Sequence, residues 1–187
     1  MSPILGIYAS QQSGHLSNFY SIATQTVGSG GASSITFSSI PSGYSHLQIR
    51  YSVLASQLGQ NLVARFNGDS TTSYFAGHRL TGDGANAAAG AYSTDNAIVL
   101  SGAAGTNALA NAPAVGIIDI LDYSNTSKNK TLRMLFGYDT NGAGTGNNYQ
   151  WVGMQSGLWM STSAITSIVM TSATLNQYSS FALYGVR

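Results

Sequence analysis

Few residues of this sequence could carry chemistry, and their spacing forms no recognisable catalytic pattern. The chain contains three histidines, six aspartates, no glutamate and no cysteine. His15, His46 and His78 lie far apart and lack the spacing of metal ligands, so we expect ordinary surface or interface residues. The lack of cysteine excludes disulfides and thiolate metal sites. We therefore predict no catalytic residue, no metal and no other cofactor.

Two aspartates lie in sequences that are typical of turns. Asp69 follows Asn67-Gly68, and Asp83 lies between two glycines. Aspartate side chains in such sequences accept hydrogen bonds from nearby backbone amides, and this is the role that we predict. The alternative is a bound calcium ion, which would need several converging oxygen ligands.

Asp119 and Asp122 offer the paired carboxylates that glycoside hydrolysis would need. A carboxylate within a buried strand needs a partner, so we expect these residues to pair with Arg133 or Arg50 inside the fold. The chain contains no Gly-x-Ser-x-Gly elbow and no glycine loop followed by lysine. We expect no enzymatic activity, and a polysaccharide depolymerase is a distant alternative.

The composition is unusually poor in charge. Only 7% of the residues are charged and the net charge is +1, so nothing favours nucleic acid as a partner. No apolar run approaches the roughly 18–20 residues of a membrane span, and the first residues lack the basic flank of a signal peptide. A surface this weakly charged is typical of a chain packed against its own copies, and we predict a homotrimer.

The sequence pattern predicts an all-β fold. Ile35–Val53 is expected to be a hairpin with its turn at 40–44, within a three-strand meander over 20–55. After the turn, apolar and polar residues alternate with period two, which indicates a half-buried strand. We expect its apolar face to line a core with residues from three later strands: Leu47, Ile49, Tyr51 and Val53 against Ile117, Phe136 and Leu183.

We count about nine to eleven short strands and no convincing helix. This number predicts an antiparallel β-sandwich, jelly-roll-like in style, as a single domain over residues 19–187. Val115–Leu121 is apolar on both faces and is expected to be a central strand covered on both sides. The last strand, 180–186, is expected in the middle of a sheet, and 82–92 reads as a long loop.

Residues 1–18 are expected to form an extended N-terminal arm. Its apolar residues come first, and polar residues follow them. The arm either straps the surface of its own domain or docks into a partner subunit, and we predict docking through Pro3, Ile4, Leu5, Ile7 and Tyr8.

Seven stretches of the sequence carry structural motifs: PILGIYAS (3–10), 21–50, RFNGD (65–69), HRLTGDG (78–84), 117–133, 156–168 and SSFALYGV (179–186). Together they resemble small virion proteins of tailed bacteriophages and cyanophages. The resemblance extends from Pro3 to Val186, and its motifs are structural, without a catalytic signature. The loops at 84–92, 101–112 and 140–148 carry none of them.

The resemblance implies a β-rich structural protein on the exterior of the virion, made in the cytoplasm of the host bacterium. We expect a tail-fibre or appendage domain that contributes to host attachment and contacts other virion proteins. A capsid decoration protein that stabilises the head is the alternative. Tyr92, Tyr149 and Trp151 are candidates for contact with a host surface glycan, and core or subunit packing is the other interpretation of these aromatic residues.

Overall fold

The computed structural model describes residues 18–56, 61–100, 104–105, 111–139 and 150–187, and within them the fold is all-β. The predicted all-β antiparallel sandwich is thus confirmed, with thirteen strands in the described residues. The strands are β1 Phe19–Thr26, β2 Ala32–Phe37, β3 His46–Ala55, β4 Leu62–Phe66, β5 Phe75–Gly82, β6 Ala87–Asp95, β7 Ile98–Leu100, β8 Ala104–Gly105, β9 Ala114–Leu121, β10 Lys130–Tyr138, β11 Trp151–Trp159, β12 Ile168–Leu175 and β13 Ser180–Val186.

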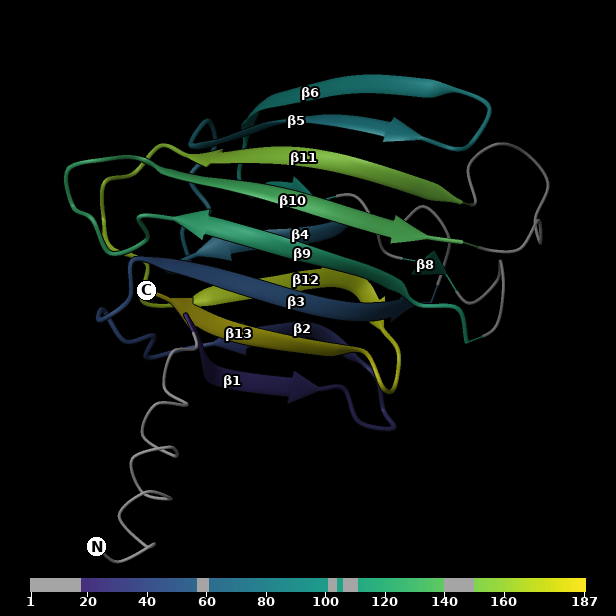
Figure 1. The fold of residues 1–187 in the computed structure, drawn as a ribbon, viewed down its shortest axis with the longest axis horizontal. Helices are drawn as coiled ribbons and strands as arrows, with labels where there is room; N and C mark the ends of the chain where they lie inside the picture. The colour runs from purple at the N-terminus through teal and green to yellow at the C-terminus, as the bar shows by residue number, and fades with distance from the viewer. Residues whose placement is uncertain (1–17, 57–60, 101–103, 106–110, 140–149) are drawn as a thin grey trace, which may run out of the picture.

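The strands form two layers, which are joined at the end of β3 (Figure 1). Sheet A has the order β6-β5-β11-β10-β9-β3-β13-β1, and sheet B, behind it in the figure, has the order β2-β12-β4-β7. The end of β3 joins the two sheets, because Ala55 pairs with Leu175 of β12. β13 lies between β1 and β3, which confirms the predicted position of the last strand inside a sheet.

The core lies between the two sheets, and β3 supplies one of its walls. Its four alternating residues from Leu47 to Val53 are buried as predicted, and so are Phe136 and Leu183. The prediction for Ile117 is wrong, because its side chain points outward and is 40% exposed, whereas Ile118 is buried. Two adjacent isoleucines fit either register of the alternation, and tertiary packing decides between them.

This correction leads to a prediction about two neighbouring residues of β9. We expect Ile118→Ala to lower the free energy of unfolding by about 2–5 kcal/mol, because it leaves a cavity in the core. Ile117→Ala changes the same side chain on the exposed face and should stay within about 0.5 kcal/mol in the isolated chain. Urea denaturation of both variants tests the register, and equal losses would contradict it.

The predicted hairpin over 35–53 and the meander over 20–55 are wrong. β2 pairs with β12 in sheet B, and β3 pairs with β9 and β13 in sheet A. The turn at 40–44 therefore carries the chain from one layer to the other. A turn signal shows where the chain changes direction, but the pairing partners depend on residues more than 60 positions away.

The prediction of a loop over 82–92 is also wrong in its second half, because β6 begins at Ala87. β6 is the edge strand of sheet A, and its register places Gly90 opposite Arg79 of β5. A Cβ atom at Gly90 would lie 3.1 Å from the Arg79 side chain, so the small residue lets the arginine pack against the strand. An edge strand needs only one ladder of hydrogen bonds, which explains why small residues of low β-propensity form one here.

Candidate functional site

The outer face of sheet A, on the side away from sheet B, carries a row of large apolar side chains. The strand register places Leu80 of β5 opposite Met154, Met154 opposite Leu135, and Leu135 opposite Ile117. These four side chains are 40–58% exposed. Cross-strand neighbours on one face contact each other, so the row is continuous across β5, β11, β10 and β9.

A second row on the same face widens this apolar surface. Val152 pairs with Gly82 on one side and with Gly137 on the other, and Gly137 pairs with Val115. Val152 and Val115 are 61% and 54% exposed. Six large apolar side chains thus lie together on one face. Large exposed apolar patches on a soluble protein commonly mark an interaction site.

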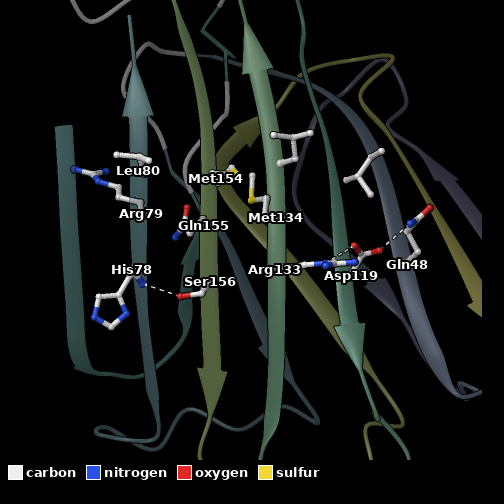
Figure 2. Close-up of a pocket in the computed structure, with 12 residues that line it drawn as sticks. Gln48, His78, Arg79, Leu80, Asp119, Arg133, Met134, Met154, Gln155 and Ser156 are labelled. Carbon is white, nitrogen blue, oxygen red and sulfur yellow. Dashed lines mark hydrogen bonds and ion pairs between the residues drawn. The ribbon is translucent and has the colours of Figure 1, made fainter. Parts of the chain in front are cut away.

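A row of polar side chains lies on the same face, next to the row from Leu80 to Ile117 and on the side away from Val152 and Val115. The polar row and the apolar row from Leu80 to Ile117 border a shallow groove of about 650 Å³, which we call the outer groove (Figure 2). In Figure 2, Leu80 and Met154 lie toward one end of the strands and His78, Ser156, Arg133, Asp119 and Gln48 toward the other, with Arg79 and Gln155 between them. The polar side of the groove is formed by His78, Ser156, Arg133, Asp119 and Gln48.

The charged groups of the polar row are already paired with one another. Arg133 Nε donates to Asp119 Oδ2 at 3.0 Å, and Gln48 Nε2 donates to Asp119 Oδ1 at 2.8 Å. Arg50 Nε then donates to Gln48 Oε1 at 2.8 Å, and its guanidinium lies 4.8 Å from the centre of the Tyr184 ring. The predicted Asp119–Arg133 pair therefore forms, but on the outer face instead of inside the fold.

Asp122 does not join Asp119, because it lies in the turn after β9. Its carboxylate accepts a hydrogen bond from Lys128 Nζ at 2.8 Å, and this bond holds the pKa of Asp122 below its usual value. His46 Nδ1 accepts the Asp122 amide at 3.0 Å, and His78 lies on β5, four strands away in sheet A. In the described part of the chain, no three histidine or aspartate residues are grouped so that they could hold a metal ion.

Asp69 and Asp83 have the turn roles that the sequence predicts. Asp69 Oδ1 accepts the amide of Thr71 at 2.8 Å. Asp83 Oδ1 accepts the amides of Asn86 at 2.6 Å and Ala85 at 2.9 Å, and these bonds lower the pKa of Asp83. The Oδ1 atom of each carboxylate is therefore engaged with the backbone, and the Oδ2 atoms accept from the side chains of Trp159 and Asn86.

The aromatic candidates for glycan contact do not form one exposed cluster in the described residues. Tyr92 and Trp151 are partly buried and pack against the core. Burial raises the pKa of Tyr92 to about 12, and the Arg79 guanidinium lies 5.9 Å from the centre of the Trp151 ring. Tyr149 lies outside the described residues, as does the predicted docking arm at Pro3, Ile4, Leu5, Ile7 and Tyr8. Glycan contact stays a prediction.

Sequence reasoning missed the outer groove, although part of its signal was visible. Val115–Leu121 reads as apolar on both faces, and the structure places it centrally, between β10 and β3. Its inner face is buried, but its outer face is uncovered in the single chain. Leu135 on β10 and both Val152 and Met154 on β11 are also apolar residues on the strand face opposite the core. Taken together, such positions on three strands indicated an apolar outer face.

Comparison with known proteins identifies no relative. No family model matches the chain, and no curated protein matches it. The VP2 subviral particle of infectious bursal disease virus has a TM-score of 0.13 and 14% identity, over 90% of this chain and 41% of that chain. A candidate pore-forming toxin from Bacteroides vulgatus has a TM-score of 0.11 and 9% identity, over 83% of this chain and 55% of that chain. We draw nothing from scores this low.

The described residues contain no helix long and apolar enough to span a membrane.

Proposed function

We propose that this chain is a non-enzymatic structural subunit of a larger assembly and that it assembles through the outer face of sheet A. The observation that carries the proposal is the continuous apolar row from Leu80 to Ile117, exposed in the single chain. Full burial of an exposed side chain of this kind is worth roughly 1.5–3 kcal/mol, and these four are still about half exposed in the single chain. The bordering charges pair among themselves, so the face offers packing instead of reactive groups.

The assembly that we propose is the exterior of a tailed-phage virion. Support comes from the resemblance of the motifs at 21–50 and 117–133 to small phage virion proteins, and from the low charge of the surface. Within the particle we favour a tail-fibre or appendage position that contributes to host attachment, in a homotrimer. Other virion proteins are the remaining partners of this proposal.

The test of assembly uses a variant with two changes on the outer face. We expect Leu135→Ser combined with Met154→Ser to raise the dissociation constant of the oligomer by at least about a hundredfold, because two buried apolar contacts are lost. Both residues are more than half exposed in the single chain, so thermal melting of the dissociated variant should show a folded domain. Sedimentation velocity at micromolar concentration measures the association.

The matched control is Tyr178→Ser, which removes an apolar side chain that is 77% exposed but lies outside sheet A. This control should associate like the wild type. A wild-type chain that sediments as a monomer, or a double variant that associates normally, would contradict the proposal. Mass spectrometry of purified phage particles tests the virion assignment separately, and absence of the chain from the particles would refute it.

A further inference from the structure

The apolar side of the outer groove is long enough to contact a short apolar peptide. Its apolar side crosses four neighbouring strands, which corresponds to roughly 14 Å at about 4.8 Å per strand spacing. An extended segment of six residues spans about 20 Å. Residues 3–8 of this chain, Pro-Ile-Leu-Gly-Ile-Tyr, supply apolar side chains over that length and carry no charge.

The first described residue, Asn18, lies at the end of the ladder between β1 and β13. The Arg187 amide donates to the Asn18 carbonyl at 3.1 Å, so Asn18 continues the ladder between β1 and β13. Asn18 therefore extends the line of β1 past the end of sheet A. The Arg50 guanidinium lies 5.1 Å from the centre of the Phe19 ring and belongs to β3, the strand between β13 and β9 in the sheet order.

The length of the preceding segment is sufficient to reach a neighbour. Residues 9–17 separate the apolar segment from Asn18 and contain mostly polar residues and glycine. Nine extended residues span up to about 30 Å, which is comparable to the width of a small domain. A segment that continues in the direction of β1 can thus cross to an adjacent subunit without reversing over its own sheet.

We propose that residues 3–8 of one copy of this chain fill the outer groove of a neighbouring copy. The inference rests on the proposed function, since it presupposes an assembly, and it adds the identity of the occupant. Each subunit then donates one arm and receives one, so every groove is occupied in a closed ring of copies. The polar row from His78 to Gln48 borders the bound segment on one side, and Val115 and Val152 lie beyond it on the other.

Because the chain contains no cysteine, engineered single cysteines can test this arrangement. We assemble a tagged Ile7→Cys chain with an untagged Met154→Cys chain and oxidise the mixture. The expected product is a disulfide between the tagged and untagged chains. The control replaces Met154→Cys by Thr36→Cys, an exposed position on β2 of sheet B, and should give no such product.

The possible results separate this inference from the proposed function. If the oligomer forms normally but gives no disulfide between Ile7→Cys and Met154→Cys, the inference that the arm fills the groove is overturned. The proposal that the chain assembles through the outer face is then unaffected. A double variant whose two cysteines join within one chain also overturns the inference about the arm, since the arm then covers its own groove. A wild-type chain that stays monomeric overturns both proposals.

A second measurement tests the contact by its energetics. Ile7→Ser and Met154→Ser should each raise the dissociation constant of the oligomer by about tenfold or more. Combined, they should raise it by less than the product of the two effects, because both remove the same contact. Independent, multiplicative effects would show that Ile7 and Met154 do not meet.

Discussion

Lys130→Met should lower the free energy of unfolding by about 3 kcal/mol, which corresponds to about 6–12 °C in the melting temperature of a domain of this size. Lys130 is fully buried at the start of β10. Its Nζ donates to the carbonyls of Asn125 at 2.6 Å, Lys128 at 2.7 Å and Thr162 at 3.0 Å. Methionine fills the space but leaves three carbonyls without their donor, and unsatisfied buried polar groups are costly.

The matched control for this experiment is Lys128→Met, two residues earlier. Lys128 pairs with Asp122 at 2.8 Å, but its side chain is 62% exposed, and an exposed ion pair contributes at most about 1 kcal/mol. Urea denaturation of the two variants therefore compares a buried lysine with an exposed one. Similar losses in both would show that the three carbonyls find other partners.

Trp159→Ala should be comparably severe, with a loss of about 3–5 kcal/mol, because it empties a large site between the sheets. The Trp159 indole is 2% exposed, and its ring centre lies 5.6 Å from Phe66 and 6.4 Å from Phe75. Trp159 therefore belongs to the core between the sheets. Calorimetric or urea unfolding measures the loss. A variant that melts like the wild type would contradict the assignment of Trp159 to the core.

Trp159→Phe separates the ring from its hydrogen bond. The indole Nε1 donates to Asp69 Oδ2 at 2.7 Å, so the variant keeps most of the ring packing and loses about 1–3 kcal/mol. Desolvation raises the pKa of Asp69, but hydrogen bonds from Thr71 and Trp159 outweigh it and lower the pKa below its usual value.

The lowered pKa of Asp69 gives this variant a specific pH dependence. A carboxyl group with a lowered pKa in the folded state stabilises the fold above its unfolded pKa, about 3.9, and this stabilisation is lost as the pH falls through the folded pKa. The difference in free energy of unfolding between wild type and Trp159→Phe should therefore be full at pH 7 and shrink below about pH 4. A difference that is constant between pH 7 and pH 3 would refute the role of this bond.

The sequence predicted the inner face of the sandwich better than the partners of its strands. The alternation from Leu47 to Val53 gave the correct buried residues, because burial on one face leaves a local pattern. Strand pairing depends on distant segments, so the meander over 20–55 could not be distinguished from strands in separate layers. Lys130 shows a further limit, since nothing in its local sequence indicates a buried lysine.

The candidate site was less predictable than the fold, for a related reason. Ile117, Leu135 and Met154 are far apart in the sequence and become neighbours only through the register of β9, β10 and β11. Each residue alone is an ordinary apolar position in a strand. Their shared exposure follows from which face the second sheet covers, and that depends on the whole topology.

The pairing of the first and last described residues also has a mechanical consequence. Asn18 and Arg187 lie side by side at one end of the antiparallel pair β1 and β13. A force that pulls on both ends would therefore separate these strands one hydrogen bond at a time, like a zipper, instead of shearing the whole ladder at once. β1 should peel away first and at low load, while the remaining seven strands of sheet A stay paired.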